Sequence, residues 1–106
     1  MNHRIRTAAM ILLAASIAAP AFAQSAGADT YKAKCAMCHG PDGTAATPMG
    51  KMMKIPSFKA PDQAKATEAS YIATTKDGKG KMPAYNGKLT DGQIKDVVSY
   101  IRSLQK

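Results

Sequence analysis

The sequence predicts a small all-α domain with three main helices and long loops around a bound group. Three stretches have helical character, and no stretch alternates apolar and polar residues as a half-buried strand does. Large apolar side chains are also too few to fill the centre of a domain of this length. These three observations favour helices that enclose a non-protein group over a fold based on a sheet.

The N-terminus has the organisation of a secretory signal peptide. Two arginines precede an almost wholly apolar run, Ala8–Ala19, and the small-residue cleavage signal Ala21–Ala23 follows Pro20. The run is short for a membrane span, and an uncleaved anchor is the alternative. We therefore expect residues 1–23 to be removed and residues 24–106 to form one domain in the periplasm, without membrane insertion.

The first two predicted helices flank a long loop. The first helix covers about residues 29–38 and places Cys35 and Cys38 on one face. Residues 40–61 contain several glycines and prolines and show no sustained period, which predicts a loop. Loops of this length are typical of segments that wrap a ligand. The second helix covers about residues 67–76 and ends at a glycine cap.

The last helix is specified at its start and along one face. Thr90 and Gln93 form a capping box, with Thr90 as the N-cap residue. Leu89 and Ile94 occupy the positions of a hydrophobic staple across that cap. The helix then carries one apolar stripe, which consists of Ile94, Val97, Val98, Ile101 and Leu104.

The apolar content of the domain is low. Only nine of its 83 residues are Ile, Leu, Val or Phe, well below the roughly 20% under which a charged chain is expected to be disordered. A short chain with so small a core needs a disulfide, a metal or another group to hold it together. Because the last helix is nevertheless well specified, we expect a large apolar cofactor at the centre.

The chain is basic. Its formal net charge is +8, which falls to +6 when Arg4 and Arg6 leave with the signal peptide. A basic surface favours anionic partners, although solubility alone also explains it. Arginine-rich stretches with interleaved aromatic residues are missing from the sequence, so we expect no nucleic-acid binding.

Residues 34–40 read KCAMCHG, in which a histidine directly follows two cysteines three positions apart. A zinc site needs four ligands, whereas the chain has 2 cysteines and 2 histidines, of which His3 leaves with the signal peptide. A thioredoxin-like dithiol expects a βαβ context and leaves His39 unexplained. Haem attachment uses every residue, because Cys35 and Cys38 form thioethers to the vinyl groups and the histidine binds iron.

These segments resemble the class I c-type cytochromes, which are small carriers with a single haem. Cys35–His39 matches their attachment motif, Gly80–Tyr85 is similar to the segment that supplies the second axial ligand, and Leu89–Leu104 is similar to their last helix. The resemblance covers residues 27–105. It implies a small cytochrome c fold wrapped around one covalently attached haem c.

The resemblance implies further roles for residues outside the attachment motif. Pro48, nine residues after His39, is similar to the family proline whose carbonyl accepts a hydrogen bond from the histidine ligand. Tyr31 and Tyr100 are placed for the contact between the first and last helices, and Gly27 would permit their close crossing.

The second axial ligand is expected to be a methionine, because His39 is the only histidine after residue 23. Met37 lies inside the attachment motif, on the wrong side of the ring. Met82 lies in a glycine-flanked loop fixed by Pro83, and this context together with the resemblance favours Met82 as the ligand. The alternatives are Met52 and Met53, which lie with Met49 in the long loop.

Ligation by His39 and Met82 leaves no open iron position, which favours electron transfer over catalysis. We therefore expect a periplasmic, monomeric one-electron carrier that is not an enzyme and that serves protein electron donors and acceptors. One alternative is a haem c electron-transfer subunit of a specific periplasmic dehydrogenase or oxidase complex. Another is a small peroxidase in which Met82 does not bind iron. Lysines near the site would steer docking onto acidic partner surfaces, and these are Lys34, Lys51, Lys54, Lys79, Lys81 and Lys88.

Overall fold

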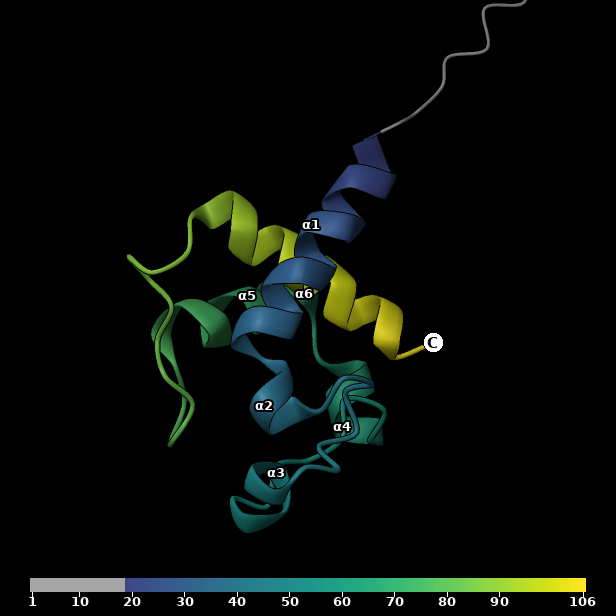
Figure 1. Ribbon diagram of the computed structural model, residues 1–106, viewed down its shortest axis with the longest axis vertical. Helices are drawn as coiled ribbons and strands as arrows, with labels where there is room; N and C mark the ends of the chain where they lie inside the picture. Colours follow the sequence, from purple (N-terminus) through teal and green to yellow (C-terminus); the bar gives the residue numbers. More distant parts are fainter. Residues whose placement is uncertain (1–18) are drawn as a thin grey trace, which may run out of the picture.

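The computed structural model describes the backbone of residues 19–106 and the side chains from residue 24 onward. The predicted signal peptide, residues 1–23, lies outside the described residues except for the backbone of its last five positions. The described chain folds into six helices and contains no β-strand beyond two isolated bridges, so the all-α prediction is confirmed (Figure 1). The helices are α1 (Ala19–Lys34), α2 (Ala36–His39), α3 (Pro48–Met52), α4 (Pro61–Lys65), α5 (Glu68–Asp77) and α6 (Asp91–Leu104).

Three of these helices have ten or more residues, which confirms the prediction of three main helices. The predicted start of the first helix was wrong, since α1 begins at Ala19 rather than near Asp29. The added turns are rich in alanine, which has the highest helix propensity, and Pro20 lies in the first turn, where a proline is tolerated. The helix then breaks at Cys35 and resumes as α2.

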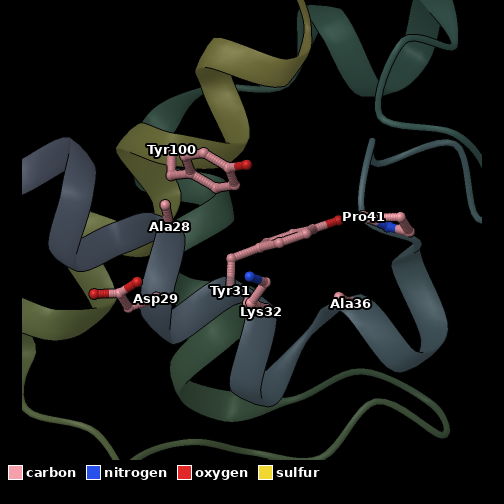
Figure 2. Close-up of a pocket in the computed structure, with 7 residues that line it drawn as sticks. All are labelled: Ala28, Asp29, Tyr31, Lys32, Ala36, Pro41 and Tyr100. Atoms are coloured by element: carbon pink, nitrogen blue, oxygen red, sulfur yellow. The ribbon is translucent and has the colours of Figure 1, made fainter.

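The core forms where α1 crosses α6, near the centre of the molecule (Figure 1). A Cβ atom placed on Gly27 would collide with the backbone carbonyl of Asp96, so only glycine allows this approach. The rings of Tyr31 and Tyr100 meet at the crossing with centroids 5.2 Å apart. Figure 2 shows the Tyr31 ring reaching from α1 toward Pro41. The predicted contact between the first and last helices is thus present.

Helix α6 has the predicted cap and the predicted buried face. The Thr90 hydroxyl accepts a hydrogen bond from the Gln93 amide, and the Gln93 side chain accepts one from the Thr90 amide. Leu89 packs against the core beside the buried Ile94, where the staple was expected. The buried residues of the stripe are Ile94, Val97, Val98 and Ile101.

The segment from residue 40 to residue 61 is a long connection, as expected, but it contains the short helix α3 and ends where α4 begins. Its ends are held close to the attachment motif by backbone hydrogen bonds. The Ala45 amide donates to the His39 carbonyl at 2.7 Å, and the Phe58 amide donates to the Gly43 carbonyl at 2.9 Å. These bonds return the connection to the motif, where the Phe58 ring stacks on that of His39.

In the part of the chain that the structure describes, none of the helices combines the length and the apolar character needed to cross a bilayer.

Candidate functional site

The attachment motif lies at the junction of α1 and α2. The Cys35 amide donates to the Tyr31 carbonyl at 2.8 Å, and the His39 amide donates to the Cys35 carbonyl at 3.0 Å. This helical geometry carries both half-buried, unpaired thiols and the imidazole into one cavity. Burial, with a smaller contribution from the neighbouring Cys38, raises the pKa of Cys35 to about 11. The Cys35 thiol therefore stays protonated at neutral pH in the absence of a bound group.

The cavity has a volume of about 650 Å³. Cofactor pockets in proteins occupy about 300–1,000 Å³, so this space suits a cofactor rather than a single ion. Its walls come from the attachment motif, the long connection, α5, α6 and residues 78–89, which we call the Met82 loop. The lining includes Cys35, Cys38, His39, Met53, Phe58, Tyr71, Met82, Tyr85, Val97 and Ile101.

His39 has an unsatisfied polar atom inside the fold. Its Nδ1 is buried and has no hydrogen-bond partner among the described residues. Its ring stacks on that of Phe58, with centroids 4.6 Å apart and an angle of 18° between the ring planes. Burial lowers the pKa of His39, which favours the neutral imidazole that metals bind. An orphaned, neutral imidazole beside two thiols fits a metal-containing cofactor.

Met82 reaches the same cavity from a tight turn. The Lys79 amide donates to the Met82 carbonyl at 3.2 Å, and the Met82 amide donates to the Lys79 carbonyl at 2.9 Å. Gly78 precedes this turn with φ +76°, and a Cβ there would lie 2.7 Å from the Met82 carbonyl oxygen. The turn therefore needs glycine at position 78 and fixes the backbone of Met82.

The other methionines are distributed unequally around the cavity. Met53 also lines it. Met37 and Met52 point into solvent, with 77% and 74% of their surface exposed. Neither of these two residues nor Met49 lines the cavity. Among residues 24–106, the geometry thus reduces the candidates for a thioether ligand to Met82 and Met53.

Comparisons with known proteins agree on one family. A family model described as cytochrome c oxidase, cbb3-type, subunit III, matches residues 22–101. Cytochrome c6 of Picosynechococcus sp. is 36% identical over 77% of this chain and 75% of its own length. Cytochrome c6 of Leptolyngbya boryana is 35% identical over 73% of this chain and 87% of its own. The chain belongs to the c-type cytochromes.

Among solved structures, this cytochrome is similar to the KustC0563 c-type cytochrome, with a TM-score of 0.69 and 29% sequence identity. The match covers 76% of this chain and 98% of that one. The prediction of a small cytochrome c fold is therefore confirmed. Membership of the family implies a haem c cofactor. The cavity, the two thiols and the orphaned imidazole of the cytochrome fit that group.

Pro48 is not among the residues that line the cavity of this cytochrome. It is the exposed first residue of α3, where its fixed φ suits a helix start, and the Thr47 hydroxyl caps that helix. The structure records no hydrogen bond between the Pro48 carbonyl and Nδ1 of His39. Its role as an acceptor for the histidine therefore stays a prediction.

Two functional contacts were not found from the sequence of the cytochrome. Phe58 is the only phenylalanine after residue 23, and this could have marked it as a core residue. Its stacking on His39 depends on the path of the long connection, which the sequence does not give. Tyr85 lines the cavity, and its hydroxyl donates to the Lys34 carbonyl at 3.0 Å. No local pattern indicates a contact over 51 residues.

Among the described residues that line the cavity of the cytochrome, the acidic and basic side chains outside the attachment motif are all lysines. Four of the six predicted docking lysines belong to this set, whereas Lys51 and Lys88 do not line the cavity. The four lysines that line the cavity are exposed, so they form a basic rim around it. The rim lysines are Lys34, Lys54, Lys79 and Lys81.

Proposed function

We propose that this c-type cytochrome carries single electrons between redox proteins through one covalently bound haem c. The observation that carries the proposal is the single cavity into which Cys35, Cys38, His39 and Met82 all project. In this proposal the two thiols hold the cofactor as thioethers, and the imidazole and the methionine sulfur bind its iron. When bound, the cofactor supplies reversible one-electron redox chemistry.

Met82 is the proposed second axial ligand rather than Met53. Its backbone is fixed by the reciprocal hydrogen bonds with Lys79 and by the turn at Gly78. Pro83 restricts it further, because a proline disfavours helical backbone at the preceding residue. A fixed backbone lowers the entropy that a ligand loses on binding metal. The backbone of Met53 is also held, since its amide donates to the Met49 carbonyl at 2.9 Å, so the preference for Met82 rests on the turn at Gly78 and on Pro83.

The protein's other contribution is to exclude water and small ligands. Phe58, Val97 and Ile101 form an apolar part of the cavity wall, and each is at least 95% buried. With both His39 and Met82 as ligands, an iron behind such a wall would have no free position for a substrate. We therefore propose that the protein is a carrier and not an enzyme, which sets aside the peroxidase alternative.

The basic rim supports the proposal that partners dock through acidic surfaces. Lysines at the mouth of the cavity attract a negatively charged partner to the place where electrons leave. Such steering raises the rate of association more than the affinity, which suits a carrier that must release each partner after transfer. We propose that the protein acts as a monomer.

The proposed site of action is the periplasm, after removal of residues 1–23. The positive start, the apolar run and the small-residue cleavage signal support export, and export agrees with covalent haem attachment to two cysteines. Mass determination of the secreted protein tests this step. A mass that includes residues 1–23 would overturn it and favour the anchored form.

A second candidate function is that of a haem c electron-transfer subunit in an oxidase or dehydrogenase complex. The description of the matching family model as an oxidase subunit favours it. Purification of the protein from its own cells at low salt separates the two candidates. A free protein of one-domain mass supports the carrier, and a stoichiometric partner supports the subunit.

The ligand assignment is tested by absorption spectra of the haem-loaded protein with Met82→Ala, and with Met52→Ala as a matched control at an exposed methionine. The oxidised wild type is expected to show a sulfur–iron charge-transfer band. Met82→Ala should lose this band and bind carbon monoxide when reduced, whereas Met52→Ala should behave as the wild type. If Met82→Ala keeps the band, Met82 is not the ligand, and Met53→Ala is then the variant that should lose it.

A further inference from the structure

Tyr85 joins two walls of the cavity that are far apart in the sequence. Its hydroxyl donates to the Lys34 carbonyl at 3.0 Å, and 51 positions separate the two residues. Lys34 is the last residue of α1 and directly precedes Cys35. Tyr85 follows Met82 by three residues. The bond therefore connects the Met82 loop to the end of α1, next to the attachment motif.

The remaining hydrogen bonds of the Met82 loop, residues 78–89, do not make this connection. The Tyr85 amide donates to the Thr75 carbonyl at 3.0 Å, and the Asn86 amide donates to the Lys76 carbonyl at 3.1 Å, so both lead back to α5. The other bonds of the loop stay within it or lead to the end of α5. Across residues 24–106, the Tyr85 hydroxyl provides the only hydrogen bond between the loop and the chain before α5.

The Lys34 carbonyl is a good hydrogen-bond acceptor because it lies at the C-terminus of α1. The last carbonyls of a helix lack intrahelical partners, and the helix dipole concentrates negative charge on them. A phenol donates one hydrogen bond, and the Tyr85 ring is half-buried in the cavity wall, which holds its hydroxyl toward α1. Without the hydroxyl, the Lys34 carbonyl loses this partner, and the hydrogen bonds that still lead out of the loop all reach α5.

We propose that Tyr85 is a positioning residue whose hydroxyl holds the Met82 loop closed against the attachment side of the cavity. The inference rests on the axial role proposed for Met82. Closure would keep the Met82 sulfur in the cavity, where it could bind the iron of the cofactor, and would limit the entry of external ligands. The apparent affinity for an external ligand is proportional to the fraction of molecules in which the loop is open, so loss of the bond raises that affinity.

The test compares Tyr85→Phe with Tyr100→Phe in the haem-loaded, oxidised protein. Both variants remove one phenol oxygen, but Tyr100 lies at the crossing of α1 and α6 and does not line the cavity. Imidazole is titrated against each protein and against the wild type, and its binding is followed by absorption. The reduction potential and the free energy of unfolding are measured on the same samples.

We expect Tyr85→Phe to keep the charge-transfer band and to bind imidazole about twofold to tenfold more tightly, the effect of losing one hydrogen bond. Tyr100→Phe should bind imidazole as the wild type does. Wild-type affinity in Tyr85→Phe would overturn the inference, and an equal rise in both variants would also do so, because it would reflect a general loosening. If the wild type itself lacks the band, the proposed Met82 ligation fails first, and this inference fails with it.

Discussion

Replacing Gly27 with alanine tests whether α1 and α6 approach as closely as the fold requires. The new Cβ would lie 2.8 Å from the carbonyl carbon of Asp96 and 3.1 Å from Cβ of Tyr100, and closer still to the Asp96 carbonyl oxygen. The obstructing atoms are helix backbone, which cannot rotate away as a flexible side chain does. The two helices must therefore move apart.

Two opposing free energies set the size of the effect. Alanine stabilises a helix by about 1 kcal/mol relative to glycine. Overpacking of a well-packed core costs about 1–3 kcal/mol, and the upper part of that range is expected here because the clash is with backbone at the main helix crossing. We therefore expect Gly27→Ala to lower the free energy of unfolding by about 1–2 kcal/mol. For a domain of this size, this corresponds to a fall of about 4–16 °C in the unfolding midpoint.

The matched control is Gly92→Ala in the first turn of α6. A Cβ there meets only the Thr90 hydroxyl, at 3.9 Å, so the helix propensity acts without a clash. This variant should be more stable than the wild type by about 0.5–1 kcal/mol. Unfolding of the haem-loaded proteins in guanidinium chloride, followed by circular dichroism, measures both. The reasoning would be refuted if Gly27→Ala were as stable as the wild type or gained as much as the control.

Two further predictions concern the cap of α6 and the basic rim. Thr90→Ala removes the acceptor for the Gln93 amide and should lower the free energy of unfolding by about 1 kcal/mol, which thermal unfolding measures; an unchanged midpoint would contradict the capping role. Lys79→Glu reverses one charge of the basic rim. The Coulomb energy between this position and a partner charge about 10 Å away in water then changes by about 0.8 kcal/mol, so electron exchange with an acidic redox protein should slow about fourfold at low salt. Stopped-flow kinetics should show the difference vanish at high salt, and exposed Lys95→Glu, away from the cavity, should leave the rate nearly unchanged.

The features that were predicted correctly depend on neighbours in the sequence. The capping box and apolar stripe of α6 follow from positions three and four residues apart, which a helix always brings together. The predicted attachment motif at Cys35–His39 is also local, because one helical turn fixes which of its side chains share a face, and its role stays a prediction. The predicted start of α1 was wrong. Its first five residues, 19–23, have the sequence expected at the end of a signal peptide, so they were not assigned to the helix.

The sequence by itself thus determined the helical class, the scarcity of core residues that calls for a cofactor, and the motif that is predicted to bind one. Only the tertiary structure decided which methionines face the cavity and that Phe58 lies on His39. It alone joined Tyr85 to the end of α1. The physical reason is that these contacts depend on how the long connection and the Met82 loop close around the helices. Residue spacing predicts contacts within one helix, but it does not predict which residues meet when a loop lies between them.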